Sequence, residues 1–330
     1  FKQKTAYEIM PSLVGSEMCI RDRPKFAVSS LNALFKNGYN ILAVITAKDK
    51  PVGREKKITP PPVKKAAIKY KIPVMQPDKL SSVCSKISFL KPDLIIVCAY
   101  GKIVPKSILE IPRYGAINIH PSLLPKYRGP SPIQSAILNG EKETGITIIK
   151  MNEKMDAGPI LYQSRTKIKE NDNYKTIYQR LSYRSAKVLI KILPKIVNGS
   201  IQPIEQNEKE ATYTKLISKE DGKIYWHKPA KEIERQIKAF YPWPGTYTFL
   251  KIKNQLKRLK ILDAYTVIPS PDLVEKRKYG QVFTDDKKQM LVQTGKNCLL
   301  LEKVQLEGRK AISGKDFLKG YPQIIGSILQ

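Results

Sequence analysis

The sequence has 330 residues, which is long enough for two domains with sizeable cores. It contains no apolar run of the ~18 to 20 residues that a membrane-spanning helix requires, so we expect no membrane partner. Its four cysteines lack the spacing of metal ligands, which predicts no metal site and favours a reducing compartment. The net charge of +30 favours a polyanionic partner, although a lysine-rich bias of composition would give the same charge.

The first 23 residues do not fit the pattern of the rest of the chain. Residues 1–23 show neither a clean hydrophobic period nor the n-region and h-region of a signal peptide. They resemble translated adaptor or vector sequence, so we interpret them as a non-native extension. A disordered native extension is the alternative.

Residues 24–203 alternate between helix and strand patterns. Helical periodicity, with start and stop residues, predicts helices at 24–36, 62–70, 78–88 and 172–197, and two more that begin at Pro105 and Pro130. Short apolar runs predict buried strands at 40–46, 71–76, 93–99, 116–119, 145–151 and 159–166. Because strand–helix–strand units close with right-handed crossovers, we expect a Rossmann-like α/β domain with a mostly parallel sheet.

The pattern changes after this domain. Residues 204–210 are polar and have the extended character of a linker. Residues 211–330 are expected to form a second domain, which opens with a helix at 228–239. Short alternating runs predict strands at 246–253, 257–267, 279–284, 289–294 and 298–304. Their regular spacing, with turn residues between them, predicts a small C-terminal β-barrel of the OB-like type.

Three polar residues at the ends of predicted strands form a candidate site. Open parallel sheets bind ligands beyond the carboxyl ends of their strands, where we expect Asn118, His120 and Asp156. Asn118 and His120 lie two residues apart on one strand, so their side chains point the same way. Asn118 could then donate to a developing oxyanion, while Asp156 orients the His120 ring and stabilises its protonated form. A structural role for His120 also stays open, because a single loop histidine is more often structural than catalytic.

A longer motif surrounds these residues. The pattern NxHxSLLPxxRGxxP begins at Asn118, and DxGPI begins at Asp156. Together they resemble the signature of the folate-dependent formyltransferases, which use 10-formyltetrahydrofolate as donor. The resemblance implies that Asn118, His120 and Asp156 are the catalytic residues. It further implies that one turn lines the folate site, formed by Ser122, Leu123, Leu124 and Pro125.

The rest of the chain narrows the resemblance to the methionyl-tRNA formyltransferases. The runs ATYTKLISKEDGKIYW and IKAFYPWPGT resemble their C-terminal domain, and residues 46–62 resemble the basic insertion that meets the acceptor end of the tRNA. This implies initiator methionyl-tRNA as the acceptor, with the basic barrel binding its phosphates. The residues then implied to contact the tRNA are Lys48, Lys50, Arg54, Lys56 and Lys57.

Two other classes of function stay open at this point. Another 10-formyltetrahydrofolate-dependent enzyme, acting on a sugar nucleotide or on glycinamide ribonucleotide, would share the first domain. A non-catalytic RNA-binding relative would keep the basic loop and the barrel. We expect a monomer of the bacterial cytoplasm. A mitochondrial or plastid protein is the alternative, because residues 1–23 stand where the native start would be.

One feature departs from the family pattern. The family begins with a β-strand and a Gly-Thr-Pro turn before the first helix, whereas Asp22-Arg23-Pro24 stands at the turn here. No matching strand is recognisable before it. We therefore expect the catalytic domain to lack its first, central strand, with several kcal/mol lost in unpaired backbone groups and exposed apolar faces.

Overall fold

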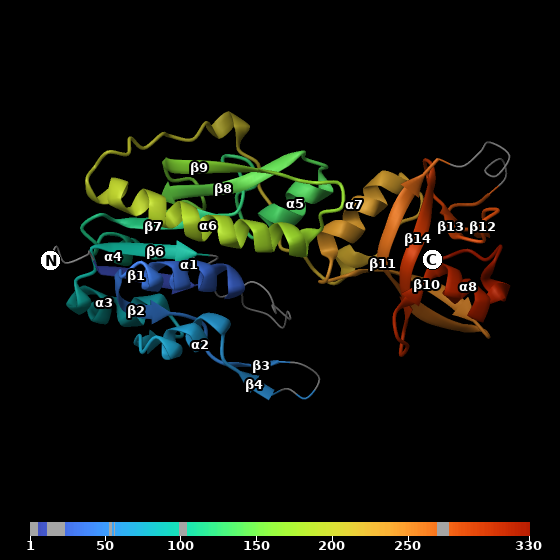
Figure 1. Ribbon diagram of the computed structural model, residues 1–330, viewed down its shortest axis with the longest axis horizontal. Helices are drawn as coiled ribbons and strands as arrows, with labels where there is room; N and C mark the ends of the chain where they lie inside the picture. The colour runs from blue at the N-terminus through green and yellow to red at the C-terminus, as the bar shows by residue number, and fades with distance from the viewer. Residues whose placement is uncertain (1–5, 12–23, 53–54, 56, 99–103, 269–276) are drawn as a thin grey trace. The chain divides into compact units, whose positions relative to one another are not determined.

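The chain folds into two compact units. The computed structural model describes residues 6–11, 24–52, 55, 57–98, 104–268 and 277–330. The N-terminal unit holds most of the chain up to Lys215, and the C-terminal unit holds residues 216–330 together with 134–141 and 169–175 (Figure 1). Within the described ranges, no helix combines the length and apolarity needed to cross a membrane.

The N-terminal unit is built on a seven-stranded sheet with the order β5-β2-β1-β6-β7-β8-β9. Its strands are β1 (Ala6–Pro11), β2 (Asn40–Ile45), β5 (Val74–Met75), β6 (Leu94–Cys98), β7 (Ala116–His120), β8 (Glu143–Lys150) and β9 (Ile160–Lys167). All neighbours from β5 to β7 are parallel, whereas β8 and β9 run antiparallel to their neighbours. The prediction of an α/β domain with a mostly parallel sheet is therefore confirmed.

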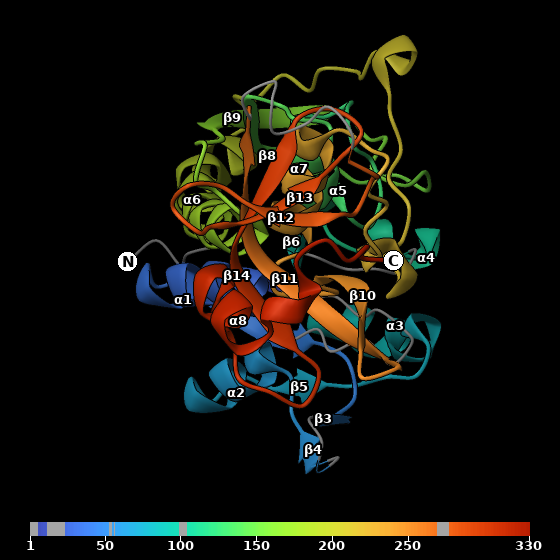
Figure 2. The same ribbon diagram turned by 90° about the vertical axis from the view of Figure 1, so that its right-hand side faces the viewer.

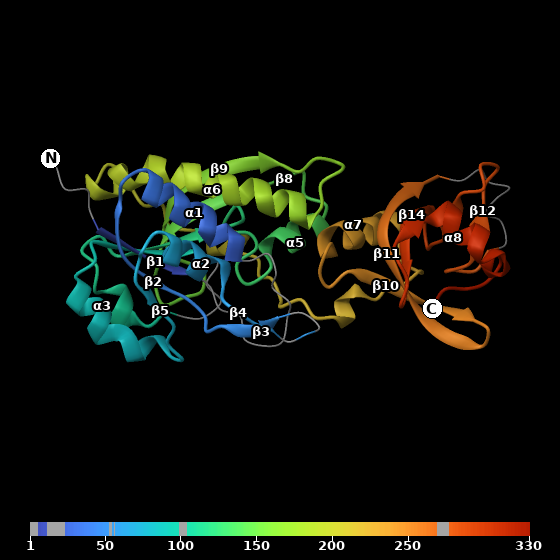
Figure 3. The same ribbon diagram turned by 60° about the horizontal axis from the view of Figure 1, so that its bottom comes forward.

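Helices cover both faces of this sheet. They are α1 (Pro24–Lys36), α2 (Pro62–Lys69), η1 (Leu80–Val83), α3 (Cys84–Leu90), α4 (Lys106–Leu109) and α6 (Tyr174–Val197). Figures 2 and 3 show α1 and α6 on one side of the sheet and α3 on the other, and Figure 2 shows α4 on the same side as α3. The rings of Phe26 and Tyr178 meet edge to face between α1 and α6. Every residue of β6 is buried, as expected for a strand covered on both faces.

The structure differs from the sequence analysis at the centre of the sheet. We expected the position between β2 and β6 to be empty. Instead, β1 pairs there in parallel with both neighbours, from Tyr7 opposite Leu94 to Pro11 opposite Cys98. The physical reason is that the backbone groups of two central strands need partners, and an extended segment supplies them. The non-native origin of residues 1–23 stays a prediction.

The basic loop also contains secondary structure that we did not predict. Two short strands, β3 (Lys50–Val52) and β4 (Lys57–Thr59), pair as an antiparallel hairpin. The hairpin projects away from the seven-stranded sheet (Figures 1 and 2). Alternation along the strands places Lys50 and Lys57 on one face and Ile58, which is 68% exposed, on the other.

The C-terminal unit contains an antiparallel sheet in the order β10-β11-β14-β13-β12, with β15 paired to β14. Its strands are β10 (Thr246–Ile252), β11 (Gln255–Val267), β12 (Val282–Thr284), β13 (Met290–Gln293), β14 (Cys298–Leu306) and β15 (Ile312–Ser313). Its helical segments are α5 (Pro132–Leu138, mostly in this unit), η3 (Glu220–Gly222), α7 (Ala230–Phe240), α8 (Gly314–Gly320) and η5 (Pro322–Ile324). Ile233 and Ile237 of α7 join Leu259 and Leu301 of the sheet in one buried cluster.

The expected closed barrel is not confirmed. Among the described residues, the strands of this sheet run from β10 to β12 without pairing to each other at the ends. The last residues of the chain lie against both end strands. Val282 of β12 donates to the Ser327 carbonyl at 2.9 Å, and Phe249 of β10 exchanges two hydrogen bonds of 2.9 Å with Gln330.

A buried carboxylate connects α7 to the sheet. Glu234 is 3% exposed, and its carboxylate accepts hydrogen bonds from the Thr266 hydroxyl at 2.7 Å and from the Lys238 amine at 2.5 Å. Burial by itself raises the pKa of this carboxyl. The hydrogen bonds from Lys238, Thr266 and Lys231 outweigh burial and lower the pKa from 4.5 to about 2.

We predict that Glu234→Gln lowers the free energy of unfolding at pH 7 by on the order of 2 kcal/mol. Because the pKa in the folded protein is lowered, the contribution is complete above pH 4.5 and is lost as pH falls towards 2. Urea unfolding at a series of pH values measures it, with the exposed Glu232→Gln on the same helix as control. A constant difference between the variants from pH 7 to pH 2 would contradict the prediction.

Candidate active site

The end of β7 meets the turn that precedes β9. Asn118 and His120 point to the same side of β7, and both reach the carboxylate of Asp156. The Asn118 amide donates to Asp156 Oδ1 at 3.1 Å, and His120 Nδ1 lies 3.5 Å from the same oxygen. The three residues that the sequence analysis singled out therefore form one cluster, around a side chain that is 12% exposed.

The surroundings of His120 fix the tautomer of its neutral ring. Nε2 lies 2.9 Å from the carbonyl oxygen of Tyr127, and a carbonyl only accepts, so Nε2 carries the hydrogen. Nδ1 is then the basic nitrogen, and it faces Asp156. The residue is 4% exposed. A proton taken up by this ring arrives between Nδ1 and a carboxylate, which is an arrangement suited to general acid–base chemistry.

The turn that carries Asp156 has little freedom. Asp156 Oδ2 accepts from the backbone N–H of Gly129 at 2.8 Å, so loop and strand hold the same carboxylate. Its φ of +52° lies in the left-handed region, which costs on the order of 1 to 2 kcal/mol for a residue with a Cβ atom. At Gly158 a Cβ atom would lie 1.8 Å from the carbonyl oxygen of Lys150. Both features confine residues 156–158 to one placement.

The turn implied to line the folate site is held from within. The buried Ser122 hydroxyl donates to the Lys126 carbonyl at 2.7 Å, so this side chain supports the turn. Leu124 is also buried, and the peptide bond that follows it is cis. Leu123 and Pro125 are partly exposed. Of the four residues, these two therefore have side-chain surface that a ligand could contact.

Strand β8 packs against the turn from Ser122 to Pro125. The Thr147 hydroxyl donates to the Ser122 carbonyl at 2.7 Å and accepts from the Leu124 N–H at 3.1 Å. At Gly145 a Cβ atom would lie 2.4 Å from the backbone carbonyl oxygen of Ser164 and 2.4 Å from Leu123 Cδ2, so the rigid backbone on one side requires glycine here. The turn is thus seated on the antiparallel part of the sheet.

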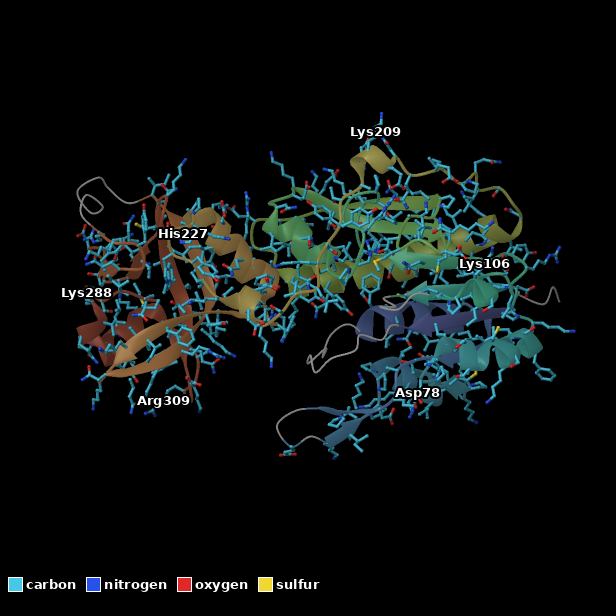
Figure 4. The ribbon with its side chains drawn as sticks, turned by 180° about the vertical axis from the view of Figure 1, so that it is seen from behind. Asp78, Lys106, Lys209, His227, Lys288 and Arg309 are labelled. Carbon is cyan, nitrogen blue, oxygen red and sulfur yellow. The ribbon has the colours of Figure 1, made fainter. Side chains whose placement is uncertain are left out.

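A segment far along the chain packs against the motif. We call residues 204–215 the strap; it includes η2 (Glu208–Glu210), from which Lys209 points outward (Figure 4). Arg128, which is 1% exposed, donates from Nε and Nη2 to Gln206 Oε1, from Nη1 and Nη2 to the Glu208 carboxylate, and from Nη1 to the Tyr213 hydroxyl. The hydrogen bond to Glu208 raises the pKa of Arg128, and the same bond lowers the pKa of Glu208.

The strap also pairs with the backbone of the motif. The N–H of Arg128 donates to the Thr212 carbonyl at 2.8 Å, and the N–H of Thr214 donates to the Arg128 carbonyl at 2.8 Å. The Tyr127 N–H donates to the Thr212 hydroxyl at 2.8 Å. Residues 204–210 were expected to be a linker. In the structure they belong to a segment that is hydrogen-bonded to the candidate site.

Sequence reasoning missed the strap residues. Gln206, Glu208 and Thr212 lie outside both motifs and show no local periodicity. One signal was present in the sequence, because a guanidinium pairs best with a carboxylate and residues 118–132 around Arg128 contain no Asp or Glu. The polar run after residue 204 contains such carboxylates, at Glu205, Glu208 and Glu210.

Of the five basic residues implied to bind tRNA, two lie on the hairpin within the described residues. Lys50 and Lys57 are exposed and project from the same face of the β3–β4 hairpin. Arg54 and Lys56 fall outside the described residues. The hairpin therefore presents at least two cations together.

The base of the hairpin is tied to the sheet. Lys48, the fifth of these residues, pairs with Asp78 at 2.7 Å, and both side chains are more than half exposed. The Lys64 amine binds the Asp49 carboxylate at 2.9 Å and the Gln76 amide oxygen at 2.7 Å. Hydrogen bonds from Lys64 and then Gln76 lower the pKa of Asp49. These contacts fix where the hairpin leaves the domain.

The cysteines of the described chain are free thiols. Burial raises the pKa of Cys98 to about 12 and that of Cys298 to about 11, so both stay protonated at neutral pH. Across the ranges that the structure describes, no three His, Cys, Asp or Glu side chains are grouped so as to hold a metal ion.

Comparison with known proteins decides the family. The sequence matches the formyl transferase family over residues 18–193 and the formyl transferase C-terminal domain over residues 216–322. It is 45% identical over 308 residues to a methionyl-tRNA formyltransferase of Methylacidiphilum infernorum, which covers 92% of this chain and 95% of that protein. A methionyl-tRNA formyltransferase of Bacillus subtilis is 41% identical, covering 93% of this chain and 95% of that protein.

This chain belongs to the methionyl-tRNA formyltransferase family. The resemblance seen in the sequence is therefore confirmed. The family match begins at residue 18, inside the segment that the sequence analysis treats as an extension. The fold is also similar to that of an N-formyltransferase from Helicobacter canadensis, solved with folinic acid and dTDP-3-aminofucose. That likeness has a TM-score of 0.63 at 22% identity and covers 89% of this chain and 98% of that chain, so it concerns the fold alone.

We predict that Arg128→Lys lowers the free energy of unfolding by about 1 to 3 kcal/mol. A lysine amine has three donors on a flexible stem and cannot serve Gln206, Glu208 and Tyr213 at once, which leaves the buried Gln206 oxygen short of a donor. Urea unfolding measures the loss. Arg165→Lys is the matched control, because Arg165 is exposed and pairs only with the surface residue Glu143 among the ion pairs of the described chain. A loss as small as that of the control would show that the buried network contributes no stability.

Proposed function

We propose that this chain transfers the formyl group of 10-formyltetrahydrofolate to the α-amine of initiator methionyl-tRNA. The products are formylmethionyl-tRNA and tetrahydrofolate. One observation carries the proposal: identity of 45% to a methionyl-tRNA formyltransferase extends over 92% of this chain, through both units. The clustering of Asn118, His120 and Asp156 supports it, because the cluster offers an amide donor, a base and a carboxylate to one substrate.

We propose that Asn118 stabilises the developing oxyanion by donating a hydrogen bond to it. When the amine attacks the formyl carbon, the carbonyl oxygen gains negative charge and needs a placed donor. The amide nitrogen of Asn118 carries two N–H groups, and one of them donates to Asp156. That bond fixes the plane of the amide, and the second N–H is the donor for the oxygen. Asp156 thereby orients the donor before any substrate arrives.

We propose that His120, supported by Asp156, transfers the proton of the attacking amine to the folate nitrogen. A new C–N bond forms at the formyl carbon while the bond to the folate nitrogen breaks, so the proton lost by the amine must reach that nitrogen. Nδ1 of His120 is the basic nitrogen of the neutral ring, and Asp156 faces it at 3.5 Å. The Tyr127 carbonyl holds the opposite nitrogen, so the ring keeps this orientation during the transfer.

The donor site is assigned to the turn from Ser122 to Pro125. Ser122 and Leu124 would shape it through their buried contacts, and Leu123 and Pro125 would contact the ligand. Since formyl transfer here needs only positioning, an oxyanion donor and proton movement, the proposal invokes no metal.

We propose that the tRNA binds to the basic hairpin and to the C-terminal unit. The net charge of +30 supports a polyanionic partner, and Lys50 and Lys57 would bind phosphates near the acceptor end. Lys48, Arg54 and Lys56 complete the proposed set. We also propose that the protein acts as a monomer in the bacterial cytoplasm, without a membrane partner.

We further propose that the C-terminal sheet, together with the last residues of the chain, closes into an OB-like barrel. The hydrogen bonds of Ser327 to β12 and of Gln330 to β10 support this, since the last residues would close the gap between the end strands. Closure removes exposed strand edges, which gives a rigid surface for a nucleic acid.

We predict that Asn118→Ala and His120→Ala each lower kcat for methionyl-tRNA formylation about 10²- to 10³-fold. The KM for tRNA should change little, because neither side chain is assigned to tRNA binding. Initial rates with 10-formyltetrahydrofolate and charged initiator tRNA measure both constants. Wild-type rates in either variant would rule out the assigned mechanism.

Two controls accompany this assay. His227→Ala removes the second histidine of the chain, which is exposed on the C-terminal unit (Figure 4), and should leave kcat unchanged. An amino-sugar nucleotide and glycinamide ribonucleotide replace the tRNA as acceptors in parallel reactions. Faster formylation of either small acceptor than of methionyl-tRNA would overturn the proposed function.

The hairpin gives a separate prediction. Lys50→Ala with Lys57→Ala should raise the KM for tRNA several-fold and reduce the slope of log affinity against log salt by about 2, one unit per phosphate contact. The rate at saturating tRNA should persist. Lys106→Ala is the control, because Lys106 is an exposed lysine of the same unit that lies away from the hairpin (Figure 4). An unchanged salt slope in the double variant would remove the hairpin lysines from the tRNA site.

A further inference from the structure

We infer that Gln206 is a positioning residue for formyl transfer, through which the strap sets Asp156 against His120. The inference rests on the proposed function and concerns a residue outside both sequence motifs. Gln206 lies 50 residues beyond Asp156 along the chain, yet its side chain is buried against the Asp156 turn. Gln206 hydrogen-bonds to the backbone of Asp156 rather than to the side chains assigned to the reaction. Its effect would therefore pass through the backbone that carries Asp156.

The donors of Gln206 hold both ends of that turn. Nε2 donates to the carbonyl oxygen of Asp156 at 2.8 Å and to that of Gly158 at 2.7 Å. Asp156 has a φ of +52°, a conformation that needs support from its surroundings. One amide group therefore bridges the strained residue and the residue two positions later. Removing it leaves one buried and one partly buried carbonyl group without this donor.

The side-chain oxygen of Gln206 also makes two hydrogen bonds, both with Arg128. Oε1 accepts from Arg128 Nε at 3.1 Å and from Nη2 at 2.9 Å. Turning the amide over would face its NH₂ group towards the guanidinium and its oxygen towards two carbonyls. Only one orientation therefore satisfies both sides, and Gln206 is locked between Arg128 and the turn.

The strap reaches the histidine as well as the carboxylate. Thr212 accepts from the Tyr127 N–H through its hydroxyl and from the Arg128 N–H through its carbonyl, each at 2.8 Å. The Tyr127 carbonyl in turn accepts from His120 Nε2. His120 Nδ1 and Asp156 Oδ1 lie 3.5 Å apart, and the strap contacts the backbone that holds each of them. The strap therefore helps to set this distance. Proton transfer is sensitive to such a distance.

Kinetics of Gln206 variants test the inference. Gln206→Ala should lower kcat about 10- to 100-fold per folded molecule, with both KM values within about threefold of wild type. Gln206→Glu keeps an oxygen for Arg128 but loses the two donors, so it should fold if Gln206→Ala does not and should lose kcat similarly. The control is Gln202→Ala, at an exposed position just before the strap. A kcat for both variants equal to that of Gln202→Ala would overturn the inference.

A double-mutant cycle separates positioning from general destabilisation. If Gln206 acts through Asp156, the combination of Gln206→Ala with Asp156→Asn should be no slower than Asp156→Asn alone. Independent effects would instead multiply, and that result would overturn the inference.

A spectroscopic readout does not depend on the acceptor. The chain has only two histidines, so ¹⁵N side-chain NMR resolves His120 from His227 once one of them is replaced. Gln206→Ala should shift the ring signals of His120 and leave those of His227, and Gln202→Ala should shift neither. Wild-type protein that formylates no tRNA, while His120 still responds to Gln206→Ala, would overturn the proposed function and keep the positioning role. Unchanged His120 signals would overturn the positioning role itself.

Discussion

The placement of the Asp156 carboxylate is the constraint on which the candidate site depends. A carboxylate that is 12% exposed has lost most of its water and needs protein donors instead. Asn118 donates from β7 and the Gly129 N–H donates from the loop, while His120 Nδ1 lies 3.5 Å away and becomes a donor only when the ring takes up a proton. The backbone at Asp156 is left-handed, so it does not keep this position by its own preference. The surrounding contacts keep it there.

The sheet gives this cluster one rigid side. Strand β7 pairs in parallel with β6 and antiparallel with β8, so both of its edges are occupied and its side-chain directions are fixed. The loops supply the other side through buried hydrogen bonds. In the described residues, the buried side-chain oxygens of Thr144 and Thr166 have no partner, and neither residue belongs to the trio. A buried polar network in which the members are satisfied is the kind that rigidifies a site.

Charge is used in two different ways in this molecule. Arg128 and Glu234 are buried and fully engaged, and they join segments that are distant in sequence. The exposed lysines of the hairpin are free of such constraints and suit long-range attraction of a polyanion. Buried charges therefore hold distant segments together, whereas we propose that the exposed lysines of the hairpin serve recognition. The large excess of lysine in the composition does not by itself distinguish these uses.

The sequence alone determined the features that depend on local pattern. Strand β6 was predictable from its unbroken apolar run, and Asn118 and His120 from their spacing on one strand, with the motif then indicating the family. Contacts between distant segments decided the rest. The strap, the pairing of β1 and the junction of Glu234 with Thr266 leave no period in the sequence. Each exists because a buried polar group must find a partner, and only the folded chain shows which partner lies within reach.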